Sequence, residues 1–262
     1  MFIDLENLTN MFTIADCRFH DKHKNLTQIH SKIANTTLKS FMYKNGKDLV
    51  LTFSPYEPGC ISSLFVGVQI WYYQNIMKNG MNQFFHDKSL LFYTTFKDVI
   101  LSHFKNHPTG HLYITGISMG GALSQCFYYH LRKDMNCNTT IMTFGSPRVG
   151  DATLRGWFYD QAKLKIVNYA LFKKFGLCKR IDPVVTLPHM DTTQHYTNNA
   201  NLQMMYHNKI SDLAEASIDQ DDFRLSVGSF VKKIFVTSAL DKYWEEIHNI
   251  GEYYDGLPHK AD

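Results

Sequence analysis

The stretch His111–Leu131 reads HLYITGISMGGALSQCFYYHL and changes its pattern in the middle. Residues 111–115 form a short, bulky run that is typical of a buried strand. Residues 122–131 are apolar at helical spacing, which predicts an amphipathic helix. Gly116-Ile117-Ser118-Met119-Gly120 lies between these two patterns. We therefore expect a strand, a tight turn and a helix.

The letters at this turn follow the pattern Gly-x-Ser-x-Gly. Small residues on both sides of a serine allow a strained turn that raises the hydroxyl above the sheet. An ordinary glycine-rich turn with a surface serine would carry the same letters, but the position between strand and helix favours a nucleophile. The free amides at the helix start, including that of Met119, would face an oxyanion that forms beside Ser118.

The surrounding chain alternates between strand and helix patterns. Apolar spacing predicts a helix over 89–104, a strand over 140–144 and a helix over 151–161. Residues 38–43 and 48–53 flank Asn45-Gly46, the pair that tolerates the positive φ angles of a hairpin turn. Together these patterns predict an α/β fold with a mostly parallel sheet flanked by helices.

Length and composition limit the domain organisation and the class of protein. The 262 residues are 44 % hydrophobic, which fits one domain over residues 1–262. A formal net charge of +3 with scattered lysines argues against a nucleic-acid partner. Five cysteines without CxxC spacing argue against a zinc site or a disulfide framework, and we expect no metal and no cofactor. The first residues do not resemble a signal peptide, and no run of 18 apolar residues occurs, so an intracellular protein is favoured.

Four segments together resemble the class 3 (fungal-type) lipases of the α/β-hydrolase superfamily. Thr115–Ser124, TGISMGGALS, is similar to the family's nucleophile segment. Thr143–Asp151, TFGSPRVGD, is similar to the strand and loop that follow the nucleophile helix. Arg180–Pro188, RIDPVVTLP, resembles the acid-bearing segment, and His195 matches a further, less specific histidine. The resemblance covers roughly residues 48–254.

The resemblance implies a serine, acid and histidine in that chain order. Asp182 is the expected acid, since it follows Ser118, precedes several histidines and is followed by a proline that stiffens the loop. A plain Asp-Pro turn is the alternative interpretation. Asp151 and Asp160 are the competing carboxylates, and Asp151 fits better as a helix-start residue.

His248 is the expected base, because it matches the family's C-terminal histidine followed by tyrosine. His189 and His195 lie too close to Asp182 in the chain to leave room for the strand and loop that return the base to the nucleophile. Two further histidines follow the acid, His207 and His259, and we assign His259 to the tail.

Two positions depart from the family pattern. Ile117 stands where the family usually has histidine, and we expect this residue to pack beneath the turn with little effect. Phe53-Ser54-Pro55-Tyr56 stands where the family has an aromatic residue followed by Arg-Gly and Ser or Thr. Since proline has no amide hydrogen, the second oxyanion donor is either Tyr56, by direct position, or Ser54, by a shift of one or two residues.

The resemblance implies a serine hydrolase that cleaves carboxylic ester bonds of lipids, like a triacylglycerol lipase or a phospholipase, through an acyl-enzyme on Ser118. Its partner would be a lipid or another acyl ester, with room for a transient contact with a membrane surface or a lipid droplet. The apolar segment 55–85 coincides with the family's lid, although an additional buried strand and helix would give the same pattern. The alternative function is an inactive α/β-hydrolase scaffold that binds a lipid or a protein partner.

Overall fold

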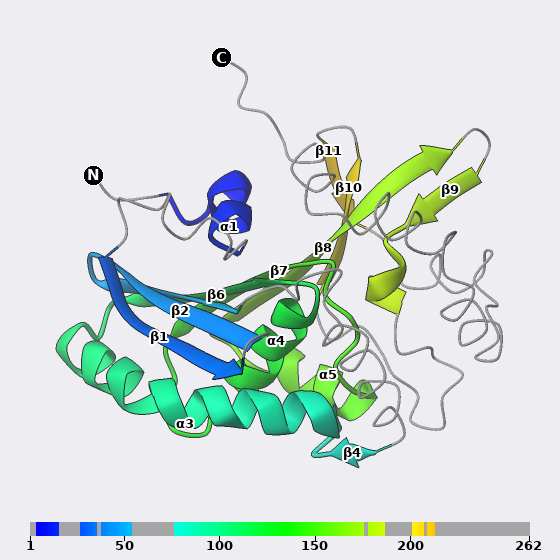
Figure 1. Ribbon diagram of the computed structural model, residues 1–262. Coiled ribbons are helices and arrows are strands. Elements are labelled where there is room, and N and C mark those ends of the chain that lie inside the picture. Colours follow the sequence, from blue (N-terminus) through cyan, green and yellow to red (C-terminus); the bar gives the residue numbers. More distant parts are fainter. Residues whose placement is uncertain are drawn as a thin grey trace.

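A computed structural model describes residues 4–15, 27–35, 38–53, 76–175, 178–186, 201–206 and 209–212. These residues form one nine-stranded sheet with helices on both faces and a small separate hairpin (Figure 1). The strands of the sheet are β1 (Thr27–Asn35), β2 (Leu38–Asn45), β3 (Asp48–Phe53), β6 (His111–Ile117), β7 (Asn138–Phe144), β8 (Leu164–Phe175), β9 (Cys178–Ile181), β10 (Asn201–Tyr206) and β11 (Lys209–Asp212). The hairpin consists of β4 (Met77–Lys78) and β5 (Met81–Asn82). The helices are α1 (Leu8–Ala15), α3 (Gln83–Asn106), α4 (Met119–Leu131), α5 (Ala152–Tyr159) and the 3-10 helix η3 (Pro183–Thr186).

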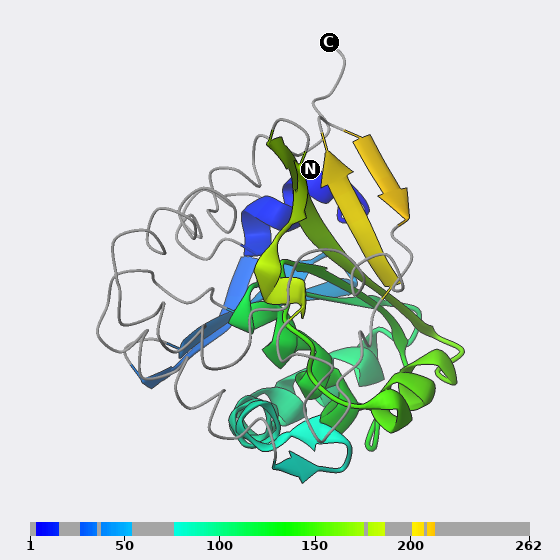
Figure 2. The ribbon, with the colours of Figure 1, turned by 90° about the vertical axis from the view of Figure 1, so that its right-hand side faces the viewer.

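The middle of the sheet is parallel and its edges are antiparallel. The strand order is β1-β2-β3-β6-β7-β8-β10-β11, and β9 pairs with β8 outside this path. Neighbours from β3 to β10 run parallel, whereas β1–β2, β2–β3, β8–β9 and β10–β11 are antiparallel. Figure 2 shows β10 and β11, in yellow, at the edge opposite the blue strands. This architecture confirms the predicted α/β fold with a mostly parallel sheet.

The predicted hairpin and helices occur close to their expected positions. Asn45 pairs with Asp48, and Gly46 between them has a φ of 67°, as the turn requires. The helix predicted for 89–104 starts earlier, at Gln83. The reason is the Asn82 side chain, which caps the helix by accepting a hydrogen bond from the Phe84 amide at 2.9 Å.

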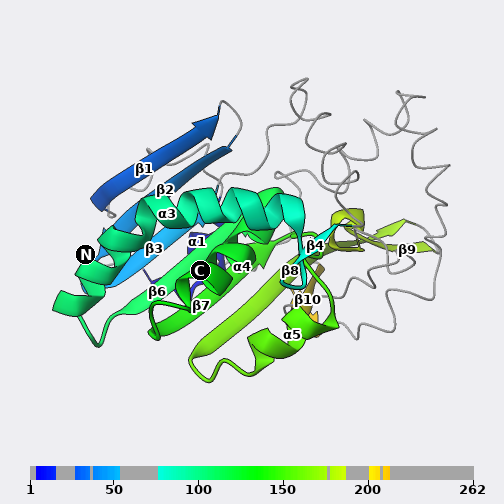
Figure 3. The same ribbon diagram turned by 90° about the horizontal axis from the view of Figure 1, so that it is seen from below.

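Two apolar clusters hold the helices against the two faces of the sheet. The larger cluster packs α3, α4 and α5 against one face, the face nearest the viewer in Figure 3, and includes Phe53 and Phe127, whose ring centroids are 5.4 Å apart. The smaller cluster packs α1 against the other face. Among the described residues, no helix is both long and apolar enough to cross a bilayer.

Helices α3 and α4 meet at two buried histidines. His86 and His130 are each 4 % exposed, and their ring centroids lie 4.8 Å apart, edge to face. His130 Nε2 lies 3.3 Å from the His86 carbonyl oxygen and donates to it when the ring is neutral. Burial lowers the pKa of His130 from 6.5 to about 4, because the packed interface excludes the water that would solvate a charged ring.

This burial predicts a pH-dependent stability. The unfolded chain binds a proton at His130 near pH 6.5 and the folded chain only near pH 4, so stability that is present above pH 6.5 is lost as the pH falls towards 4. We expect the free energy of unfolding to fall across this interval by about 2 kcal/mol more in the wild type than in His130→Gln, which retains a donor. Urea denaturation at each pH measures the difference, and an equal fall in both proteins would contradict it.

Candidate active site

Ser118 lies on the turn between β6 and α4, and its side chain is partly exposed. Its backbone has φ 54° and ψ −126°, and among the described residues only Asn79 shares a positive φ without being glycine. Such a conformation costs about 1–3 kcal/mol and persists only where the surroundings enforce it. Here the Ser118 amide donates to the carbonyl oxygen of Phe144 on the neighbouring strand at 2.8 Å. The turn therefore holds this serine in the strained shape that the sequence motif predicts.

The tight turn leaves no room for side chains at two of its glycines. A Cβ atom at Gly116 would lie 2.5 Å from the Gly120 carbonyl oxygen. A Cβ atom at Gly121 would lie 2.6 Å from the Cβ of Ser146. Glycine at position 116 therefore lets the end of β6 approach the start of α4, and glycine at position 121 lets α4 approach β7 and the loop that follows it.

Met119 is the first residue of α4, so no carbonyl four residues earlier in the helix can accept from its amide. The amides of Gly121 and Ala122 point back to the Ser118 carbonyl oxygen at 2.9 and 3.4 Å. The Met119 side chain is 3 % exposed and anchors this end of the helix in the core. The helix start beside Ser118 thus offers the amide of Met119 and the positive end of the helix dipole to a developing negative charge.

Buried polar side chains brace the turn from the side of β7 and β8. The Asn168 side chain donates to the Ser146 carbonyl oxygen at 2.9 Å and accepts from the Ser146 amide at 3.1 Å. Gln125 of α4 donates to the Ser146 hydroxyl at 3.0 Å. The Ser124 hydroxyl lies 2.9 Å from the Thr115 carbonyl oxygen. Gln125 thus ties α4 to the loop after β7, Ser124 ties α4 to β6, and Asn168 ties that loop to β8. Sequence patterns alone did not reveal these bonds.

Asp182 follows β9 and precedes η3, and its side chain is fully buried. Its Oδ1 accepts a hydrogen bond from the Val184 amide at 2.9 Å. The strand register shows which edge of the sheet it occupies. Ile117 lies opposite Phe144, Phe144 lies opposite Tyr169 of β8, and β9 returns along β8.

Ile181, the residue before Asp182, pairs with Phe172, three positions beyond Tyr169 on β8. Asp182 is therefore close to the level of Ser118, at the carboxyl edge of the parallel strands and on the side of β8. Two inter-strand steps, or about 10 Å, separate β6 from β8, the strand along which β9 returns.

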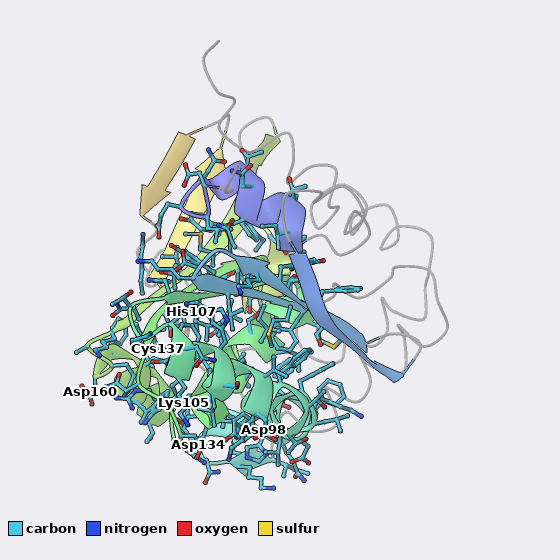
Figure 4. The ribbon with its side chains drawn as sticks, turned by 90° about the vertical axis from the view of Figure 1, so that its left-hand side faces the viewer. Asp98, Lys105, His107, Asp134, Cys137 and Asp160 are labelled. Atoms are coloured by element: carbon cyan, nitrogen blue, oxygen red, sulfur yellow. The ribbon has the colours of Figure 1, made fainter. Side chains whose placement is uncertain are left out.

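The two competing carboxylates have other positions. Asp151 caps α5, where its Oδ1 accepts from the amides of Thr153 and Leu154 at 2.9 and 3.0 Å. Asp160 is exposed at the other end of α5, and Figure 4 shows it on the side of Cys137, which precedes β7. A shallow cavity of about 290 Å³ lies at the edge of the sheet where β7 begins, and the residues that line it include Phe104 and Cys137. It is therefore not beside Ser118.

Several predicted site residues lie outside the described residues. These are the base His248, the two oxyanion candidates Ser54 and Tyr56, and the histidines His189, His195, His207 and His259. Strand β3 ends at Phe53, which pairs with Gly116 of β6, so the end of β3 lies beside the turn that carries Ser118.

Of the expected lid 55–85, residues 55–75 also lie outside the described residues. Residues 76–85 contribute to the β4–β5 hairpin and the start of α3, where Met81 and Phe85 are fully buried. Ile76, Lys78 and Asn79 in this part are exposed, and the lid over 55–85 stays a prediction.

The position before the nucleophile behaves as expected from the sequence. Ile117 is 2 % exposed and packs beneath the turn in the cluster on the α1 face. Cys126 of α4 is fully buried, and burial strongly raises the pKa of its thiol, so it is no rival nucleophile. Within the described part of the chain, no three His, Cys, Asp or Glu side chains gather as metal ligands would.

Comparisons with known proteins agree with this geometry. Residues 5–192 match the family described as lipase (class 3). The chain also resembles a solved triacylglycerol lipase with a serine protease triad at 16 % identity, covering 81 % of this chain and 85 % of that one with a TM-score of 0.61. Lipase II from Rhizopus niveus is 14 % identical, with 81 % of this chain and 86 % of that one covered and a TM-score of 0.59. Lip2 lipase from Yarrowia lipolytica is 13 % identical, with 82 % of this chain and 86 % of that one covered and a TM-score of 0.58. At these identities the solved structures show a shared fold. No curated protein matches the sequence.

The tight turn predicts that Gly116 tolerates no side chain. We expect Gly116→Ala to slow labelling of Ser118 by a fluorophosphonate about 10²-fold, because its Cβ would push the Gly120 carbonyl and displace the serine. Gly156→Ala in α5 is the matched control, since a Cβ there meets no atom within 4 Å and favours the helix. A wild-type labelling rate in folded Gly116→Ala would show that the turn has room.

Proposed function

The chain belongs to the class 3 lipase family and is a carboxylic ester hydrolase, and from this premise we propose that it cleaves lipid esters through an acyl-enzyme on Ser118. The observation that carries the proposal is the positive φ of Ser118 between β6 and α4. Strain of this kind concentrates at functional sites, where a reactive side chain must project from the backbone. Ser118 is partly exposed and lies at the carboxyl edge of a parallel sheet, which is where α/β proteins bind ligands.

The proposed reaction uses three side chains. Ser118 Oγ attacks the ester carbonyl carbon while the His248 imidazole takes its proton. The resulting oxyanion accepts hydrogen bonds from the Met119 amide and a second donor. The intermediate collapses, the ester C–O bond breaks, and the alcohol leaves with the proton from His248. Water then repeats the sequence on the acyl-enzyme, which releases the acid and restores Ser118.

Asp182 is proposed to orient the imidazole and to stabilise its charged form. Its burial supports this role, since a buried carboxylate needs partners that hold it in place. The Val184 amide fixes one of its oxygens. The long excursion of the chain through β8 and β9 brings this carboxylate back to the edge at which β6 ends, as the register of both strands requires.

We also propose a transient contact with a lipid surface at this edge. Ile76, Leu90 and Leu91 are exposed by 40 %, 36 % and 42 %, and all three lie just before α3 or in its amino-terminal half. Helix α3 leads into β6 at the edge of the sheet where the parallel strands begin. The amino-terminal end of α3 therefore lies towards the edge where these strands end. Lys78 and Lys88 stand near these apolar residues, a combination that suits the boundary between acyl chains and headgroups.

The triad assignment predicts a shared loss of activity. We expect Ser118→Ala, His248→Ala and their double variant each to lose about five to six orders of magnitude in kcat on a p-nitrophenyl ester, because the members act as one unit. Asp182→Asn should lose about four orders with its fold intact, since the imidazole then adopts the wrong tautomer. Asp151→Asn is the matched control, because asparagine also caps α5.

Steady-state kinetics and mass spectrometry of the fluorophosphonate-labelled peptide check these assignments. Near-full activity in His248→Ala would show that another residue is the base. Retained activity in Asp182→Asn would show that another residue is the acid. Absence of labelling at Ser118 in the wild type would favour the inactive scaffold.

The oxyanion segment predicts a difference between backbone and side-chain changes. If the Tyr56 amide donates, Tyr56→Phe should be nearly silent, whereas Tyr56→Pro should cost about 10²–10³ in kcat because it removes the amide hydrogen. If the Ser54 hydroxyl donates, Ser54→Ala should lower kcat by a similar factor and leave KM nearly unchanged. Thermal melts must show that each variant is folded. Unchanged turnover in Tyr56→Pro and Ser54→Ala would exclude this segment from the oxyanion hole.

A further inference from the structure

Helix α1 covers the face of the sheet opposite α3, α4 and α5 (Figure 1). The helix contacts the middle strands β3, β6 and β7. Four of its residues are at most 1 % exposed: Met11, Phe12, Ile14 and Ala15. These are the strands that lead into the oxyanion segment, the nucleophile and the loop after β7. The helix therefore packs against the backbone that supports the site, from the side away from the substrate.

One contact leads directly from α1 to the nucleophile. The ring of Phe12 meets the ring of Phe144 edge to face, with centroids 4.8 Å apart, and both side chains are fully buried. The carbonyl oxygen of Phe144 accepts the Ser118 amide hydrogen at 2.8 Å. Tyr169 also stacks on the Phe144 ring, with centroids 5.5 Å apart. Phe144 thus contacts two aromatic rings while its carbonyl holds the strained serine.

Two neighbouring contacts fix the adjacent strand ends. Ile117, which precedes the nucleophile, belongs to the same apolar cluster as Phe12. The Thr52 hydroxyl donates to the Ile14 carbonyl oxygen at 3.2 Å, one residue before β3 ends at Phe53. The carboxyl-terminal half of α1 therefore packs against the carboxyl ends of β3, β6 and β7.

The amino-terminal end of α1 is bound to residues near the starts of strands β6 and β8. Glu6, just before the helix, accepts from the Tyr113 hydroxyl at 3.1 Å. Its second oxygen lies 3.6 Å from Lys165 Nζ near the start of β8. The helix is consequently fixed at both ends, and a change at Phe12 acts locally on Phe144 rather than by releasing the helix.

We propose that Phe12 is a positioning residue for the nucleophile, acting through the Phe144 carbonyl on the backbone of Ser118. Without the ring, the end of β7 can shift, the bond to the Ser118 amide lengthens, and the serine relaxes from its positive φ. The hydroxyl then loses its alignment with the base and the oxyanion donors. A displacement of about 1 Å at a reacting atom can cost about 10² in rate. This inference rests on the proposed function of Ser118.

The test compares two truncations on the same helix. Phe12→Ala removes the ring that contacts Phe144, and Met11→Ala removes an equally buried side chain of the same cluster that has no ring. Both should lower the melting temperature. We expect Phe12→Ala to lower kcat on a p-nitrophenyl ester at least about 10-fold with KM within twofold, whereas Met11→Ala keeps kcat within about threefold.

The rate of Ser118 labelling by a fluorophosphonate should fall in parallel with kcat. If Phe12→Ala does not fold, Phe12→Leu replaces it and Met11→Leu becomes its control. We then expect kcat of Phe12→Leu to be about threefold below that of Met11→Leu. Wild-type kcat in a folded Phe12 variant, or equal losses at positions 11 and 12, would overturn the proposal. Absence of labelling in the wild type would instead reject the proposed function itself.

Discussion

The rest of the structure depends on the backbone of Ser118, which is held at positive φ where β6 passes into α4. A serine gains nothing locally from this conformation, so neighbouring elements must enforce it. Gly116 lets β6 and the start of α4 approach closely, Gly121 lets α4 approach β7 and the loop after it, and the Phe144 carbonyl fixes the Ser118 amide. The result is a hydroxyl at the carboxyl edge of the sheet beside the free amide of Met119.

The two faces of the sheet contribute differently to this turn. On one face, α4 is anchored by apolar packing and by hydrogen bonds that involve Gln125 and Ser146. On the other face, α1 packs against the strand ends through aromatic and aliphatic contacts around Phe12. Polar bonds set direction, whereas close packing resists displacement. A strained backbone needs both, because either alone would let the turn relax.

Asp182, the proposed acid, reaches the carboxyl edge of the sheet by an indirect route. Strand β8 pairs with β7 and β10 and then continues beyond them to Phe175, where it pairs only with β9 among the described strands. The return through β9 ends at Ile181, so Asp182 lies near the edge that its chain had already passed. Sequence order alone would allow Asp182 to lie far from Ser118, and the antiparallel register is what brings it back.

The sequence by itself determined the strand, turn and helix around Ser118, because a change of hydrophobic period flanked by glycines is a local signal. It also determined the α/β class and the role of Asp151 as a helix cap. The early start of α3 at Gln83 and the brace of Asn168 on Ser146 depended on tertiary structure. So did the contact of Phe12 with Phe144, which joins residues from distant parts of the chain. Such contacts have no period or spacing in the sequence, since they arise only when separate elements pack against one sheet.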